Sequence, residues 1–341
     1  MEGFGMIGRK IKGVMIAATW LVALGQHVHA ADDTSLTPQT ELVIVVGASG
    51  TPEFGEQFSN WVETWRQVSE KAATPMTVIG QSEPGDSSDR EQLKSTLDEL
   101  SVESPTPLWV VLIGHGTFAQ NAAKFNLRGP DVSATELAQW LQDSERPVVV
   151  VNCASASGAF INRLSGDNRV IVTATKSGVE QNYARFGEFF SRAIASPDSD
   201  LDHDDEVSVH EAFLRASAEV RQFYETAGRI STEHALIDDN GDGRGTPATM
   251  FRGTRAVGKA KDDAELDGRE ASRLTLAPAD ARLPFTKAEL GQRQELEVQL
   301  EELRQRKSTL DAAAYDAELE SLVLQLARLY QAAEQRQQEA P

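Results

Sequence analysis

The sequence predicts an α/β fold in which a mostly parallel β-sheet carries helices on both of its faces. Short apolar runs rich in valine and isoleucine recur over residues 41–178, and segments with apolar residues at helical spacing separate them. The runs are apolar almost throughout, without the alternation typical of a strand that has one solvated face. Strands that alternate with helices in this way are typical of a sheet covered on both sides.

The predicted elements alternate in order along the first 200 residues. Apolar runs place strands at residues 41–50, 76–80, 108–117, 146–153 and 169–178. Helical spacing places helices at residues 54–72, 87–100, 135–143, 156–165 and 184–196, and Ser133 is the expected N-cap of the third helix. Ligands of such sheets bind beyond the carboxyl ends of the strands, so the residues that follow each run are the candidates for chemistry.

The N-terminal residues 1–30 are typical of a secretory signal peptide. Arg9, Lys10 and Lys12 precede the apolar run 13–25, and Val28 to Ala30 form a small-residue cleavage site. The apolar run is short for a membrane span, although an uncleaved anchor is the alternative interpretation. We therefore expect an exported protein, periplasmic or secreted, with no stable membrane span after cleavage.

The C-terminal third differs in composition from the predicted domain at residues 41–254. Residues 255–284 are charged and contain proline and glycine, which predicts a linker. Residues 285–336 carry leucines at helical spacing with a break near residues 308–311, which predicts an antiparallel helical hairpin or short coiled coil. Its expected role is self-association, or a cap over the cleft of the sheet domain.

The charge of the chain excludes some partners. Its 341 residues have a formal net charge of −19, whereas phosphate binding requires a basic surface. We therefore expect no nucleic-acid partner and no docking on anionic lipid. The hydrophobic fraction of 40% is ordinary for a globular protein with a core.

The single cysteine, Cys153, stands at the end of the predicted strand 146–153. An exported protein with one cysteine has no internal disulfide, so this thiol is a reactive group, a site of intermolecular pairing or an inert buried side chain. His115 stands at the end of the preceding core strand in the sequence. A thiol reacts as the thiolate and needs a base nearby, and neighbouring strands lie about 5 Å apart. The two residues are therefore a candidate nucleophile and base.

The two strand ends, VVLIGHG (Val110 to Gly116) and VVVVNC (Val148 to Cys153), resemble those of the caspase–legumain superfamily of cysteine peptidases. The strand end at residues 173–178 and the following helix are similar to the legumain-type (C13) branch, in a bacterial version. This resemblance covers residues 41–252 and implies a caspase-like fold. It also implies cleavage of peptides or proteins through an acyl-thioester, with Cys153 as nucleophile and His115 as general base.

The same resemblance implies that the backbone amides of Gly116 and Cys153 stabilise the oxyanion. Amides at such strand ends suit this role because small neighbours leave them accessible to a substrate oxygen. Glu53 and Glu56, in the expected loop after the first strand, are candidates for a pocket that selects a basic P1 residue. Exposed surface acids with no role in binding are the alternative for both.

Two acidic segments fit calcium-binding loops of the EF-hand type. In the first, residues 200–211, the ligand positions 1, 3, 5, 7 and 12 are filled by Asp200, Asp202, Asp204, Glu206 and Glu211. Asp205 replaces the glycine of position 6, which requires a sharp turn. In the second, Asp238, Asn240 and Asp242 fill positions 1, 3 and 5, but position 12 carries no acid. An acidic surface loop and an ordinary tight turn are the respective alternatives.

These observations favour a cysteine endopeptidase with structural calcium and no catalytic cofactor. The alternative is a catalytically silent caspase-like scaffold, with calcium-stabilised loops and a self-associating helical tail. A thioester intermediate can also pass its acyl group to an amine, so ligation is a further alternative to hydrolysis.

Overall fold

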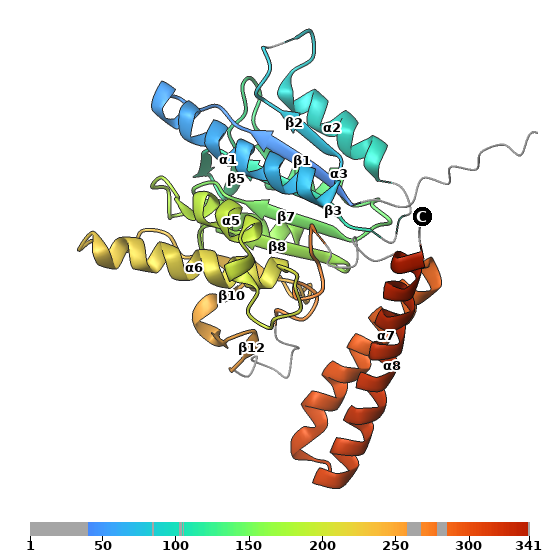
Figure 1. Cartoon of the computed structure of the whole chain (residues 1–341). Helices are drawn as coiled ribbons and strands as arrows, with labels where there is room; N and C mark the ends of the chain where they lie inside the picture. The colour runs from blue at the N-terminus through green and yellow to red at the C-terminus, as the bar shows by residue number, and fades with distance from the viewer. Residues whose placement is uncertain are drawn as a thin grey trace, which may run out of the picture. The chain divides into compact units, whose positions relative to one another are not determined.

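The computed structural model of the protein describes residues 40–83, 85–101, 104, 106–257, 267–277 and 285–339. Its main sheet has the strand order β10-β9-β8-β7-β3-β1-β2 (Figure 1). Five of its strands, β2, β1, β3, β7 and β8, are parallel, and β9 and β10 add an antiparallel edge. The prediction of a mostly parallel sheet is confirmed. The bounds are β1 (Glu41–Val46), β2 (Met76–Ile79), β3 (Leu108–Ile113), β7 (Val148–Asn152), β8 (Arg169–Thr173), β9 (Leu236–Asp238) and β10 (Thr246–Pro247).

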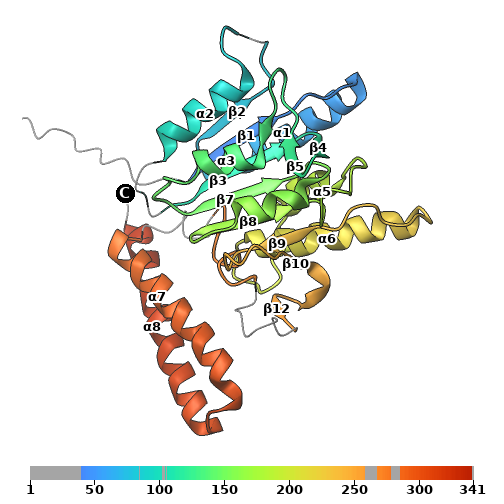
Figure 2. The same cartoon turned by 180° about the vertical axis from the view of Figure 1, so that it is seen from behind.

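Helices cover both faces of this sheet, as Figures 1 and 2 show from opposite sides. Alternate residues of each strand point to opposite faces, so Val149 packs into one core cluster and Val150 into the other. The first cluster includes α1 (Pro52–Ala72), α5 (Phe186–Ala195) and α6 (Val209–Thr226). The second includes α2 (Asp89–Leu100), α3 (Ala134–Trp140) and α4 (Ile161–Leu164).

The starts of the helices follow from capping chemistry in the sequence. Ser88, Ser133 and Ser208 each cap a helix and pair with a glutamate three residues later in a capping box. Thr51 caps α1, where Pro52 at the first helical position needs no hydrogen-bond acceptor. The expected N-cap at Ser133 is therefore correct.

Several predicted elements are shorter than expected. The strands predicted over residues 41–50 and 169–178 end at Val46 and Thr173, and the helix predicted over residues 135–143 ends at Trp140. The strand predicted over residues 108–117 ends at Ile113, and the chain continues into a small antiparallel sheet. The chain turns at Gly114, where a Cβ would lie 3.1 Å from the Cα of Gly47, so a side chain would be crowded there. The helix predicted over residues 156–165 is a 3₁₀ turn (Ser157–Phe160) followed by α4. The small sheet contains β4 (Gly116–Ala119), β5 (Ala122–Phe125) and β6 (Val132–Ser133), and a separate hairpin contains β11 (Phe251–Arg252) and β12 (Arg255–Ala256).

Part of the predicted linker packs against the sheet domain. In residues 267–277, Ala271 and Leu276 are buried in the same core cluster as α6. The Val209 N–H donates to the carbonyl oxygen of Leu274 at 2.9 Å. The prediction of a plain linker over residues 255–284 is therefore wrong for this stretch, because its few apolar residues complete the core. The predicted signal peptide lies outside the described residues.

The C-terminal helices α7 (Lys287–Gln305) and α8 (Ala312–Glu339) form a pair. A hydrogen bond of 2.5 Å from Arg336 to Glu289 joins the end of α8 to the start of α7, so the two helices are antiparallel. Leu296 and Leu303 of α7 and Leu329 and Ala333 of α8 are buried. Within the described residues, no helix combines the length and the apolar character needed to cross a bilayer.

Candidate active site and acidic loops

The ends of β3 and β7 place His115 and Cys153 at the same edge of the sheet. The two strands are parallel neighbours, and Leu112 is the register partner of Asn152. Cys153 follows β7 directly, and His115 follows β3 by two residues. The turns after the two strands also touch, because the Ser155 hydroxyl bonds to both the N–H and the carbonyl oxygen of Gly116 at 3.2 and 3.1 Å. Parallel pairing therefore places two residues that are 38 positions apart at the same edge of the sheet.

The imidazole of His115 is held in one orientation. Its Nε2 lies 3.2 Å from the carbonyl oxygen of Ser49, which follows β1. A carbonyl oxygen only accepts hydrogen bonds, so Nε2 carries the hydrogen in the neutral ring and Nδ1 keeps its lone pair. The rings of Phe54, Phe58 and Tyr183 surround the imidazole at centroid distances of 4.8, 5.4 and 6.1 Å. Nδ1 is therefore the nitrogen available as a base.

The thiol of Cys153 is buried in the core cluster between the sheet, α1 and α5. Its exposed fraction is 1%, and burial raises the pKa of the thiol far above its ordinary value. Gly187 of α5 makes this packing possible, because a Cβ there would lie 2.6 Å from the Cβ of Cys153 and 3.0 Å from its Sγ. In this arrangement the side chain is a neutral thiol that solvent does not reach.

Aromatic side chains lie over both residues. The same Cβ position on Gly187 would lie 2.6 Å from the Trp61 ring, so Trp61 and Cys153 meet at α5. Tyr183 lies beside Trp61, at 6.3 Å between ring centroids, and beside His115. The Tyr183 hydroxyl donates to Oε1 of Gln57 on α1 at 2.6 Å, and burial raises the pKa of this phenol. We call Trp61, Tyr183 and Gln57 the aromatic cover of the candidate site.

The two amides predicted to stabilise an oxyanion already have acceptors. The Cys153 N–H donates to the carbonyl oxygen of Leu112 at 2.9 Å, as the last bond between β7 and β3. This differs from the expected free donor, because strand pairing continues one residue beyond Asn152. The Gly116 N–H donates to the Ser155 hydroxyl, a side-chain acceptor that can rotate away. Of the two, Gly116 is therefore the better candidate in this arrangement.

Glu53 and Glu56 are not in a loop. Both belong to the first turns of α1, where Thr51 and Pro52 start the helix earlier than residue 54. Both side chains are exposed. Glu53 lies in the first turn, where a negative charge favours the helix dipole, so helix stability explains it without a pocket.

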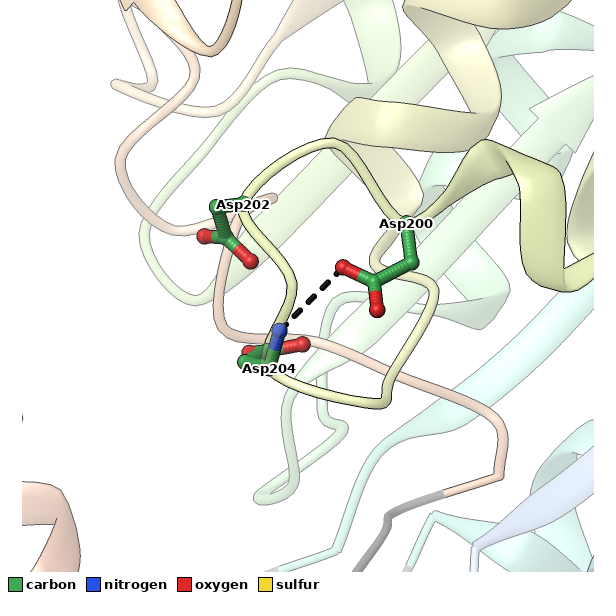
Figure 3. Close-up of side chains that lie close together, drawn as sticks. All are labelled: Asp200, Asp202 and Asp204. Carbon is green, nitrogen blue, oxygen red and sulfur yellow. Dashed lines mark hydrogen bonds between the residues drawn. The ribbon is translucent and has the colours of Figure 1, made fainter.

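The first acidic loop gathers three of its predicted ligands. Asp200, Asp202 and Asp204 offer carboxylate oxygens within 4.8 Å of one another (Figure 3). The Asp200 carboxylate accepts backbone N–H groups of His203, Asp204 and Asp205 at 2.6 to 3.2 Å. Asp205 has φ +68°, the left-handed conformation that position 6 requires. Asp205 thus takes the turn conformation of position 6 although it is not glycine, and calcium binding by the loop stays a prediction.

Glu211, the predicted ligand at position 12, already has hydrogen-bond partners. Glu211 is buried, and its carboxylate accepts the Leu201 N–H at 2.7 Å and completes the Ser208 capping box. Burial and the charges of the neighbouring acids raise the pKa of Asp202 to about 6. Burial also raises the pKa of Asp204. A carboxylate cluster with raised pKa values is one that a cation would stabilise.

The second acidic segment begins at Asp238, the last residue of β9, and includes Asn240 and Asp242. Asp238 is fully buried, whereas Asp242 is exposed. Among the described residues, Asp200, Asp202 and Asp204 are the group of three acidic, histidine or cysteine side chains close enough to share a metal. The second segment therefore offers a different geometry, with one buried carboxylate beside polar groups of the turn.

Several residues of these sites were not predicted from the sequence. Ser49, Gln57 and Tyr183 contribute a backbone carbonyl, an amide and a phenol, and no local pattern marks them. Asp267 lies next to β9 although it is separated from Asp238 by 29 positions and falls in the predicted linker.

Solved structures similar to this chain include two caspases. The Drosophila initiator caspase Dronc matches with 14% identity and a TM-score of 0.40, over 61% of this chain and 82% of that chain. Caspase-1 of Spodoptera frugiperda matches with 10% identity and a TM-score of 0.38, over 60% of this chain and 87% of that chain. Raptor of Chaetomium thermophilum matches with 14% identity and a TM-score of 0.33, over 48% of this chain and 18% of that chain. At such distances the likeness assigns no role to a residue.

No protein-family model matches the chain, and no curated protein matches it either.

Proposed function

We propose that the protein is an exported cysteine endopeptidase of the legumain-like type, with Cys153 as nucleophile and His115 as general base. The observation that carries this proposal is the bond from His115 Nε2 to the Ser49 carbonyl oxygen. It fixes the tautomer with a free lone pair on Nδ1, at the end of the strand next to the one that ends in Cys153. A base oriented through its other nitrogen is the usual arrangement for activating a nucleophile.

In the proposed reaction, Nδ1 of His115 takes the thiol proton while Sγ attacks the carbonyl carbon of the peptide. The resulting imidazolium returns the proton to the leaving amine, which gives an acyl-thioester on Cys153. A water molecule then gives a proton to Nδ1 and attacks the thioester, and the thiol is regenerated. The Gly116 N–H, released from the Ser155 hydroxyl, donates to the oxyanion in both steps.

Catalysis by this site requires the aromatic cover to open. Cys153 is 1% exposed, and a neutral thiol in an apolar environment is a poor nucleophile. Displacement of Tyr183 would bring water and substrate to the thiol and lower its pKa. The described arrangement is then the resting form, and peptide binding or a processing event selects the open form.

Calcium is the ion that the first acidic loop fits best. The donor set consists of oxygens from Asp200, Asp202 and Asp204, and the carbonyl of Glu206 stands at position 7. Glu211, at position 12, would have to exchange its backbone partners to bind the ion. The loop joins α5, which packs on Cys153, to α6, so the ion would have a structural role.

A catalytically silent scaffold is the second candidate. The burial of Cys153 favours it, since an inert cysteine packs as a small apolar side chain. In this case the calcium loops stabilise the domain, and the antiparallel α7 and α8 provide self-association. In either case we propose a protein or peptide partner and a periplasmic or secreted location.

The test is cleavage of a fluorogenic peptide library that varies the P1 residue. The full chain, purified after export, is compared with Cys153→Ala and His115→Ala, with and without calcium. We expect cleavage by the wild type and its loss in both variants. Cys153→Ser is the matched control for packing, because serine keeps a similar side-chain volume and removes only the thiol. Absence of cleavage together with no reaction of Cys153 with iodoacetamide would favour the scaffold. An added amine that appears in the product would indicate ligation.

A further inference from the structure

The carboxyl group of Asp238 is buried and only partly satisfied. Its exposed fraction is 0%, and its Oδ2 has no hydrogen-bond partner among the described residues. Its Oδ1 accepts the Ser165 hydroxyl at 3.2 Å, and the Ser165 oxygen accepts the Gly243 N–H at 2.9 Å. These two bonds turn the carboxyl group toward the turn 238–243. A buried oxygen without a donor is costly unless a cation or a water molecule meets it.

Two further buried carboxylates lie beside it and clasp two chain segments together. Asp267 accepts the N–H groups of Asp239 and Asn240 at 2.9 and 3.3 Å. Asp239 accepts in return the N–H groups of Gly268 and Ala271 at 2.9 and 2.8 Å. We call these four bonds the aspartate clasp. It joins the end of β9 to residues 267–277, which complete the core beside α6.

The negative charge of this region lacks a cationic partner among the described residues. None of the described ion pairs involves Asp238, Asp239 or Asp267. Burial and neighbouring acids raise the pKa of Asp238 to about 6 and of Asp267 to about 7. Buried carboxylates of this kind are usually neutralised by a proton or by a metal ion.

The turn itself presents oxygens to the same space. Asp242 is exposed, and its negative charge acts on Asp238 together with that of Asp239. Gly241 and Gly243 have positive φ, as in a tight turn, and backbone carbonyl oxygens of such turns are a ligand type that calcium uses. All these donors are oxygens, and no histidine or cysteine accompanies them. Such a set suits a hard divalent cation, and a flexible turn with a variable ligand number suits calcium better than magnesium.

We propose that calcium binds at the turn 238–243, with Asp238 Oδ2 as its buried ligand and Asp242 at the rim. The ion stabilises the aspartate clasp, because it neutralises the charge that opposes burial of Asp239 and Asp267. Residues 267–277 are thereby held on the sheet domain. This site is independent of the proposed peptidase, since it requires neither Cys153 nor His115.

The test measures calcium binding in full-length Asp200→Asn, in which the first acidic loop is disabled. We expect about one ion per chain by calorimetry and a rise in melting temperature of about 5 °C at saturating calcium, with a smaller effect of magnesium. Asp238→Asn removes both effects in this background. If Asp238→Asn does not fold, Asp242→Ala serves instead, because its side chain is exposed. Asp167→Asn, an exposed acid near Ser165, is the matched control and keeps both effects.

Hydrogen exchange tests the clasp separately. Calcium is expected to slow exchange at the Gly268 and Ala271 amides at least tenfold in Asp200→Asn, and not in Asp200→Asn with Asp242→Ala. Binding that persists in Asp238→Asn or Asp242→Ala would overturn the site. Binding without any change in exchange at these two amides would overturn the proposed role of the ion in holding residues 267–277.

Discussion

Removal of the Tyr183 hydroxyl group should make the aromatic cover open more often. The Tyr183 hydroxyl donates to Gln57 at 2.6 Å, and this bond joins the segment before α5 to α1 over the candidate site. Tyr183→Phe keeps the ring in contact with His115 and Trp61 and removes only this bond. A net hydrogen bond contributes about 1 kcal/mol, and water can reach the half-buried Gln57 in its absence. The open form should therefore gain about fivefold in population relative to the closed form.

The assay is the rate of alkylation of Cys153 by iodoacetamide under native conditions. Cys153 is the only cysteine of the chain, so the mass change reports this thiol alone. We expect alkylation about fivefold faster in Tyr183→Phe than in the wild type.

The control is Ser69→Ala, which removes the 2.6 Å bond from the Ser69 hydroxyl to the carbonyl oxygen of Thr74 at the C-terminal end of α1, far along this helix from Gln57. It should lower the free energy of unfolding at least as much without faster alkylation. An unchanged rate in Tyr183→Phe, or an equal increase in both variants, would refute control of access by this bond.

Three further predictions follow from the packing. Gly187→Ala should lower the free energy of unfolding by about 1–3 kcal/mol, because its Cβ would lie 2.6 Å from Cys153. Gly291→Ala on α7 should raise it by up to about 1 kcal/mol, because the added Cβ has open space. Chemical denaturation measures both changes. Burial lowers the pKa of His210 from 6.5 to about 4, so the unfolded chain binds its proton first and stability is lost as pH falls from 6.5 to 4. This loss, up to about 3 kcal/mol, should be smaller in His210→Leu when unfolding is followed at both pH values. A chain that ends at residue 277 should keep the melting temperature of the sheet domain. A chain that ends at residue 260 should melt at a lower temperature, because it lacks the buried Ala271 and Leu276. Equal melting temperatures of the two truncated chains would contradict the packing of residues 267–277.

Local patterns in the sequence determine the strands, the helix starts and the ends of the parallel strands. Runs of β-branched residues have no solvated face, so they form the centre of the sheet, as Val148 to Val151 do. A serine followed by a glutamate three residues later satisfies backbone N–H groups at a helix start. Ser133 was predicted as such a cap, and Ser208 has the same pattern. The positions of His115 and Cys153 just after strand ends follow from the same patterns, whereas the pairing of those two strands is a property of the sheet.

The sequence could not predict which groups close over those strand ends. The carbonyl of Ser49 reaches His115 because β1 lies next to β3, and strand order is a property of the whole sheet. The burial of Cys153 depends on how closely α5 approaches, which Gly187 permits through the absence of a side chain. A sequence pattern records what each segment prefers, but not the distance at which two segments pack.

The acidic segments divide in the same way. The loop 200–211 is determined by its own residues, since the Asp200 carboxylate bonds to backbone groups three to five positions ahead. The environment of Asp238 was decided by tertiary contacts, because Ser165 and Asp267 come from segments about 73 and 29 positions away. Interactions within a loop are encoded locally, and their spacing is visible in the sequence. Reciprocal bonds such as those of Asp239 and Asp267 form only when distant backbone turns present their N–H groups to each other, and this depends on the folded core.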